Sequence, residues 1–199
     1  MNKKKSYSEY LKEQFGDLID SIELEELQKK FMKNRWLDQL VWLENKANKC
    51  RDRYYKLRMI TIIGGVIVPA LITSTNSVNN SSVLMWAVII ISQAVAISAA
   101  IEEFFKYGEK HSQYRKTAEN MKSEAWQFFQ LSGAYKNFTS HRNAYADFAQ
   151  KIENILQDDV QNFIARIMQE QEKEQQEKSN VSSTTVVALD RQNLQKTTN

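Results

Sequence analysis

The sequence predicts an all-α membrane protein, in which a two-helix transmembrane hairpin carries long cytoplasmic helices that form a helical bundle. Two apolar runs, residues 57–75 and 83–101, are each long enough to cross a bilayer, because about 20 helical residues span its hydrocarbon core. The chain of 199 residues has only five glycines and one proline, which favours long helices with few turns. Basic residues flank the hairpin on both sides, whereas residues 76–82 between the runs carry no charge.

The two apolar runs differ in strength. Residues 83–101 contain no charged side chain and would span about 28 Å as a helix. The first run is interrupted by Gly64, Gly65 and Pro69, although glycine and proline are more frequent in membrane helices than in soluble ones. The alternative, a pair of buried helices in a soluble core, is disfavoured by the length of the runs.

The distribution of charge predicts the topology of the hairpin. Residues 46–58 contain six basic residues and one acidic residue, and further basic residues follow the second run from Lys106 onwards. Cytoplasmic flanks of membrane helices are enriched in Lys and Arg. We therefore expect both termini in the cytoplasm and residues 76–82 as an external loop. The only cysteine, Cys50, excludes an internal disulfide, as suits a cytoplasmic position.

The residues just before the first run are of the kind that anchors a helix at the membrane interface. Tyrosine rings favour the headgroup layer, and long basic side chains reach the same layer and bind anionic lipid. The predicted anchors are Arg51, Arg53, Tyr54, Tyr55, Lys56 and Arg58.

Two segments precede the membrane hairpin. Residues 1–20 are predicted to form a mobile N-terminus, because their start is polar and lysine-rich. No apolar run follows these lysines, so we do not expect a cleaved signal peptide. Residues 21–56 form a cytoplasmic amphipathic helix, because apolar residues recur there near helical spacing. Trp36 and Trp42 of this helix are expected in the core.

Two further segments follow the hairpin. Residues 102–170 are predicted to form a cytoplasmic helical stalk and bundle, with a first helix that continues unbroken from the second run. Gly133 is a stop signal, and Ser140 is a cap for a further helix. The apolar stripe of that helix is nearly heptad, so we expect it to pack like a coiled coil against the other helices or a neighbouring subunit. Residues 171–199 are rich in Gln, Glu, Lys, Ser and Thr, which predicts a disordered tail.

No catalytic arrangement is recognisable in the sequence. His111 and His141 are isolated, no Cys/His spacing suits a metal, and neither a phosphate-binding glycine loop nor a nucleophile elbow occurs. We therefore predict a protein that is not an enzyme and that needs no metal or cofactor. The net charge of +3, with both signs mixed along the chain, also argues against a nucleic-acid partner.

Small and polar residues form a stripe on each apolar run, and two interpretations remain open. Small residues let helices approach closely, and polar ones hydrogen-bond between helices. Alternatively, the polar stripe lines a water-filled path between several assembled hairpins, since two helices cannot enclose a pore. The candidates for pore lining are Ser92, Gln93, Ala96, Ser98, Ala100, Glu102 and Glu103. The candidates for packing and for a helix kink are Thr61, Gly64, Gly65, Pro69 and Thr73.

Glu102 and Glu103, at the cytoplasmic end of the second run, have two possible roles. In an oligomer they would form carboxylate rings, which favour cations. Alternatively they pair on the helix surface, as Glu102 would with Lys106 at a spacing of four.

Several strings of the sequence resemble a bacterial two-transmembrane family of unknown function in the SLATT superfamily, the SMODS and SLOG-associating effector domains. They are the segments 35–39 (RWLDQ), 53–58 (RYYKLR) and 114–119 (YRKTAE), together with Pro69 in the first run. The resemblance covers residues 31–163. It implies a membrane effector of a bacterial conflict system, which forms a pore when an associated signalling or sensor module triggers it.

The sequence thus leads to a primary hypothesis and an alternative. The primary hypothesis is an oligomeric, cation-favouring ion channel or pore-forming effector in the bacterial inner (plasma) membrane, gated through its cytoplasmic helices. Its expected partners are the lipid bilayer, at least three further copies of itself and a cytoplasmic sensor or signalling protein. The alternative is a non-conducting, membrane-anchored adaptor or signalling scaffold.

Overall fold

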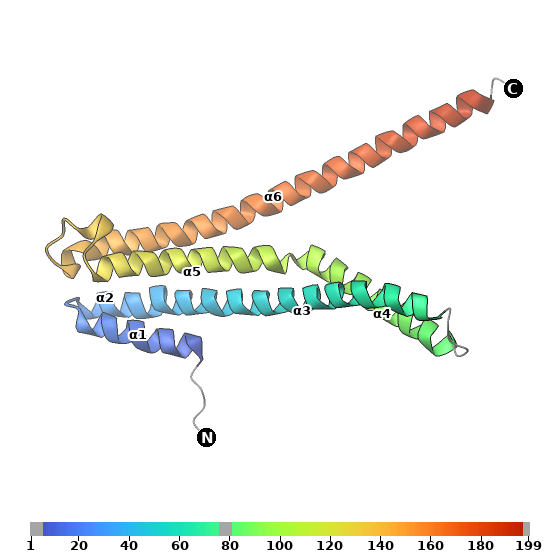
Figure 1. Ribbon diagram of the computed structural model, residues 1–199. Helices are drawn as coiled ribbons and strands as arrows, with labels where there is room; N and C mark the ends of the chain where they lie inside the picture. The colour runs from blue at the N-terminus through green and yellow to red at the C-terminus, as the bar shows by residue number, and fades with distance from the viewer. Residues whose placement is uncertain (1–5, 76–80, 197–199) are drawn as a thin grey trace. The chain divides into compact units, whose positions relative to one another are not determined.

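The computed structural model describes residues 6–75 and 81–196. Most of the predicted external loop, at residues 76–80, and the two ends of the chain lie outside the described residues. The regular elements in the described ranges are all helical (Figure 1): α1 (Tyr7–Ser21), α2 (Glu26–Phe31), the π-helix η1 (Met32–Leu37), α3 (Asp38–Thr75), α4 (Ser81–Phe105), α5 (Tyr107–Phe129), the 3-10 helix η2 (Gly133–Tyr135) and α6 (His141–Lys196). The prediction of an all-helical protein is confirmed for these residues.

The long helix α3 organises the structure. It contains most of the predicted amphipathic helix and the whole first apolar run, and it passes through Pro69 without ending. One part of α3 packs against α4 and the other part packs against α5 (Figure 1). The same helix therefore connects the apolar pair α3–α4 with the polar bundle around α5.

The core of the bundle lies around Trp36, whose side chain is fully buried as predicted. Its ring contacts Phe15 of α1, Phe129 of α5 and Phe148 of α6, with centroid distances of 5.1, 6.2 and 6.1 Å. Its indole N–H donates a hydrogen bond of 3.4 Å to the carbonyl oxygen of Met121, which satisfies its polar group inside the core. Trp42, in contrast, is 44% exposed, so its prediction as a core residue is wrong.

The segment predicted as a mobile N-terminus differs from the structure, because most of it is helix α1. Ser6 caps this helix in a reciprocal capping box with Glu9. Three residues at helical spacing, Leu11, Phe15 and Ile19, are buried against the bundle. Burial of this apolar face stabilises the helix.

The chain divides into two units, residues 1–152 and 153–199, and helix α6 extends from the first into the second. In the first unit Ser140 caps α6 as predicted, accepting a hydrogen bond of 3.3 Å from the Asn143 backbone, and Phe148 and Ile152 are buried. In the second unit the helix continues to Lys196, through the segment predicted to be disordered. Gln, Glu and Lys, which dominate the start of that segment, are strong helix formers.

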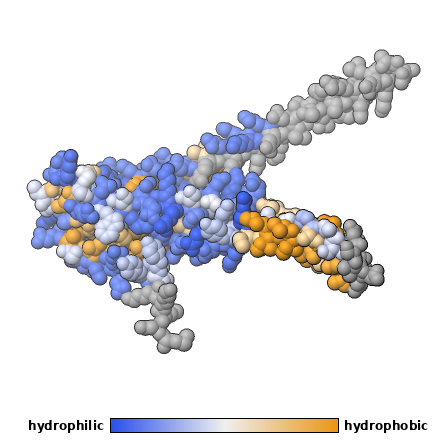
Figure 2. Space-filling model, viewed as in Figure 1, coloured by the Kyte–Doolittle hydropathy of each residue, from blue (hydrophilic) through white to orange (hydrophobic). Residues whose placement is uncertain are grey.

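The surface of α3 and α4 is divided sharply into a hydrophilic and a hydrophobic part. Figure 2 shows the hydrophobic surface gathered over the ends of these two helices, away from the hydrophilic bundle. Each helix contains an apolar window long enough to cross a membrane, and only 6% of each window is buried. A core helix of a soluble protein would be mostly buried, so these windows differ from that alternative.

Candidate functional site

The apolar parts of α3 and α4 pack through one face of each helix. On α3 the less exposed residues, which face α4, recur at alternating spacings of three and four, and include Thr61, Gly64 and Val68. A Cβ atom built on Gly64 would collide with the Val95 side chain and lie 3.6 Å from the Cγ2 atom of Ile91. Gly64 therefore allows the close approach of the two helices.

The small stripe predicted on the first run is divided between two faces of α3. Thr61 and Gly64 lie on the side that packs against α4, whereas Gly65, Pro69 and Thr73 are exposed. No atom lies within 4 Å of the position that a Cβ of Gly65 would occupy. Of these five residues, only Thr61 and Gly64 pack against α4, because neighbours in the sequence lie about 100° apart on a helix. Packing of Gly65, Pro69 and Thr73 against another helix stays a prediction.

The predicted pore-lining residues are divided in the same way. Gln93, Ala96, Ala100 and Glu103 are exposed on the side of α4 away from α3. Ser98 is only 6% exposed and lies on the face that packs against α3, so it does not share the outer stripe. Ser92 and Glu102 are half-buried. The hairpin therefore leaves one polar side chain, Gln93, exposed in the middle of an apolar helix.

The junction of α4 and α5 differs from the predicted unbroken helix. Lys106 has φ 48° and ψ 49°, the left-handed conformation, and separates the two helices. This conformation costs a non-glycine residue roughly 1–2 kcal/mol. Two residues later, a Cβ on Gly108 would lie 3.1 Å from the Tyr54 ring of α3, so the glycine permits close contact after the break. The predicted stop is nearly right, since α5 ends at Phe129 and Gly133 has φ 56°.

The predicted interface anchors lie on α3 beside this junction. Arg51 forms an ion pair of 3.0 Å with Asp52, and Arg53 donates a hydrogen bond of 3.4 Å to the Tyr107 hydroxyl. Tyr54 is half-buried by α5. The remaining three, Tyr55, Lys56 and Arg58, are exposed.

A buried charge network joins α3 to α5, and its central residue, Glu44, was not predicted from the sequence. The Glu44 side chain is fully buried and accepts hydrogen bonds of 2.8 Å from both Arg115 and Lys122. Both cations also contact Glu119, at 2.7 and 2.9 Å. A signal did exist, because Glu44 occupies an apolar register between Leu40 and Ala47. Arg115 and Glu119 belong to the string 114–119 that carries the family resemblance.

Two titratable groups of the bundle hold their protons more tightly than usual. Burial lowers the pKa of Lys122, but its hydrogen bonds to Glu44 and Glu119 and the charge of Glu44 outweigh burial, so the pKa is raised above 10.5. Burial also raises the pKa of Tyr135 far above 10.0, and a hydrogen bond to Glu124 raises it further. Both groups therefore favour their protonated forms in the folded chain.

We expect the free energy of unfolding to fall in alkali. A group whose pKa is raised by folding contributes its full stabilisation below its unfolded pKa, and loses it as the pH rises through the folded value. The decline should begin near pH 10, where tyrosine titrates in the unfolded chain. Denaturation followed by circular dichroism at a series of alkaline pH values measures it. Tyr135→Phe should make the decline shallower, and an unchanged slope would contradict the assignment.

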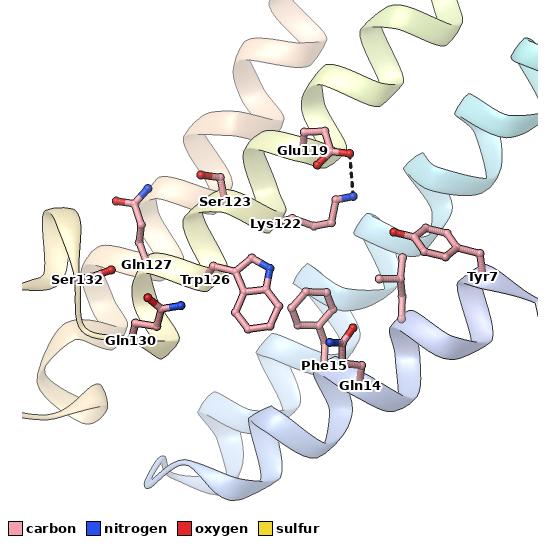
Figure 3. A pocket seen from close by; sticks show the side chains of 11 residues that line it. Tyr7, Gln14, Phe15, Glu119, Lys122, Ser123, Trp126, Gln127, Gln130 and Ser132 are labelled. Carbon is pink, nitrogen blue, oxygen red and sulfur yellow. Dashed lines mark hydrogen bonds and ion pairs between the residues drawn. The ribbon is translucent and has the colours of Figure 1, made fainter.

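An open cavity of about 520 Å³ lies beside this network. Figure 3 shows residues of α1 on one side and of α5 on the other, with the Phe15 and Trp126 rings between them. The centroids of these rings are 5.3 Å apart. The cation at the cavity, Lys122, is already paired with two carboxylates, so the cavity offers no unpaired positive charge to an anionic ligand.

Comparison with known proteins identifies the family. Residues 38–143, just over half of the chain, match the profile of DUF4231, described as a protein of unknown function. The chain belongs to the DUF4231 family. No curated protein and no solved structure matches it. The DUF4231 region of this chain begins with α3 and ends at the start of α6, so it includes the apolar pair, the junction at Lys106 and the charge network.

Proposed function

We propose that this DUF4231 protein is an oligomeric ion channel or pore-forming effector of the bacterial inner membrane. In this proposal α3 and α4 cross the bilayer and both termini are cytoplasmic, as the basic residues before α3's apolar run and after α4 favour. The resemblance to the SLATT superfamily agrees with such an effector. The cytoplasmic helices would gate the pore, because α3 runs unbroken from the bundle into the apolar pair.

The observation that carries the proposal is the exposed polar stripe of α4. Gln93 and Glu103 project away from α3, together with the small residues Ala96 and Ala100. A polar side chain that faces lipid in the hydrocarbon core is costly, and such residues usually face a neighbouring helix or a water-filled path. A single hairpin gives Gln93 neither a neighbouring helix nor a water-filled path. We therefore expect several hairpins to assemble with this stripe facing the centre of the assembly.

The exposure of the two glutamates indicates which of them would form the charged ring that selects cations. Glu103 belongs to the outer stripe and is exposed, whereas Glu102 is half-buried. A ring of Glu103 carboxylates at the cytoplasmic mouth would attract cations.

Conductance in planar bilayers tests this function. The purified protein should conduct with a preference for cations, and Glu103→Gln should lower the cation-to-anion permeability ratio several-fold, because it removes the charged ring. The neighbouring Glu102→Gln is the matched control and should change the ratio little. Absence of conductance at every voltage, pH and lipid composition tested would refute a channel. Electron microscopy should show a ring of four or more subunits around an open axis.

The adaptor remains the second candidate because α6 has an exposed apolar face in the second unit. This face consists of Val160, Phe163, Ile164, Ile167 and Met168, which recur at helical spacing and are 39–58% exposed. Such a stripe suits a partner helix. The adaptor predicts a monomer or closed dimer in mild detergent, and a function that survives Gln93→Leu.

A further inference from the structure

A corner between α3 and the α4–α5 junction brings two residues together that are 54 positions apart in the chain. The Arg53 guanidinium lies 5.5 Å from the centroid of the Tyr107 ring and donates a hydrogen bond of 3.4 Å to its hydroxyl oxygen. The hydroxyl accepts this bond, so its own hydrogen remains available for an acceptor. The guanidinium has five N–H donors, and most of them also remain available.

Several contacts fix the position of this corner. The left-handed Lys106 turns the chain between α4 and α5, and the Tyr107 ring stacks on Phe105 at a centroid distance of 5.3 Å. Gly108 lies against the Tyr54 ring of α3. These contacts position Tyr107 beside Arg53, so the two donors do not depend on a flexible loop.

The cations on this part of α3 differ in their partners. Arg51 is paired with Asp52 at 3.0 Å. Within the part of the chain that the structure describes, Arg53, Lys56 and Arg58 form no ion pair with a carboxylate. An exposed guanidinium fixed beside a phenol, with no carboxylate partner, is suited to a phosphate oxyanion, which arginine binds with two parallel hydrogen bonds.

The depth of the corner points to the source of that phosphate. Arg53 lies six residues before Met59, where the exposed apolar surface of α3 begins, and Tyr107 lies six residues after Ile101 of α4. Six helical residues rise about 9 Å, and arginine side chains extend towards the headgroup layer. The neighbouring rings of Phe104 and Tyr55 are 80% and 58% exposed, as expected of an aromatic belt at an interface.

We infer that Arg53 and Tyr107 form a binding site for the headgroup phosphate of an anionic lipid at the cytoplasmic face of the membrane. Arg53 would donate two hydrogen bonds to the phosphate oxygens, and the Tyr107 hydroxyl would donate a third. Lys56 and Arg58 add positive charge on the same stretch of α3. The inference rests on the proposed membrane insertion of α3 and α4, but not on conduction.

Lipid that copurifies with the protein tests the site. The full-length chain is reconstituted in equimolar phosphatidylcholine and phosphatidylglycerol, extracted in mild detergent, and analysed for both lipids by mass spectrometry. We expect enrichment of phosphatidylglycerol, and Arg53→Gln should reduce the enrichment about fivefold, as expected for one basic residue at an anionic surface. Tyr107→Phe should reduce it less. Lys12→Gln on α1 is the control and should retain the enrichment, because Lys12 is not among the predicted interface anchors and pairs with Asp38.

Each other outcome is decisive. Equal enrichment in the Arg53→Gln and wild-type proteins would refute the site while leaving the proposed channel intact. A wild-type protein that shows no enrichment of phosphatidylglycerol but binds inorganic phosphate would refute a lipid ligand and indicate free phosphate instead. A chain that does not enter vesicles, measured by flotation, would refute both this site and the proposed membrane function.

Discussion

Replacing Glu44 by leucine should lower the free energy of unfolding by about 3 kcal/mol. The substitution leaves Lys122, whose side chain is only 11% exposed, without its partner on α3. Removal of one member of a buried ion pair typically costs about 3–5 kcal/mol, because the other charge stays buried. The lower end of that range is expected here, since Lys122 keeps its contact of 2.9 Å with Glu119. Chemical denaturation in mild detergent, followed by circular dichroism, measures the loss.

Two further variants test whether the loss of stability comes from the unpaired buried charge of Lys122 or from substitution in this region in general. Glu119→Gln removes a carboxylate of the same network that is 49% exposed, and should cost less than about 1 kcal/mol. The double variant Glu44→Leu with Lys122→Met removes both buried charges and should recover much of the lost stability. If the double variant is as unstable as Glu44→Leu alone, the loss of stability comes from poor packing of the leucine at position 44. It then does not come from the unpaired charge of Lys122.

Replacing Gly64 by leucine should separate α3 from α4 and abolish the conductance proposed above. Even a Cβ at this position meets the Val95 side chain, and a larger side chain would force the two helices apart. Overpacking typically costs about 1–3 kcal/mol, and the greater cost is expected where two helix backbones approach closely. The distance between labels on the two helices, measured by electron spin resonance, should increase, and conductance should be lost.

The adjacent glycine provides the matched control. Gly65→Leu adds the same side chain in the same helix, but Gly65 faces open space in the single chain. The distance between α3 and α4 should then remain that of the wild type. If conductance is nevertheless lost, the exposed face of Gly65, Pro69 and Thr73 contacts another subunit. An α3–α4 distance that is unchanged in Gly64→Leu would contradict the close packing.

The amino-acid pattern predicts the helical class and its apolar segments well, because these depend on local properties. The two apolar runs and the scarcity of glycine and proline in the whole sequence already favour long helices, and the Ser140 cap depends only on residues within one helical turn. Helix α1 was not predicted in the N-terminal segment, because its stability comes from tertiary burial. Leu11, Phe15 and Ile19 form an apolar face, and this face stabilises the helix only when the bundle buries it.

The candidate site is predicted in composition but not in geometry. Periodicity correctly places Gln93, Ala96, Ala100 and Glu103 on one face of α4, but it does not determine which face meets α3. The helix break falls at Lys106 itself, which is neither glycine nor proline, and Gly108 follows two residues later. Contacts of Tyr107 and Gly108 with α3, which the sequence does not reveal, accompany the break. The charge network of Glu44 also depends on tertiary structure, since the residues that bind its carboxylate lie more than 70 positions away in the sequence.

The sequence by itself determined the two apolar segments, their basic flanks and the helices around them, since hydropathy and helix propensity are properties of neighbouring residues. Only the tertiary structure decided which glycine lies against α4, which carboxylate is buried, and that Arg53 meets Tyr107. Those facts depend on the rotation of each helix about its axis and on contacts between distant segments. Packing fixes both, because a close-packed interface accepts only side chains that fit it.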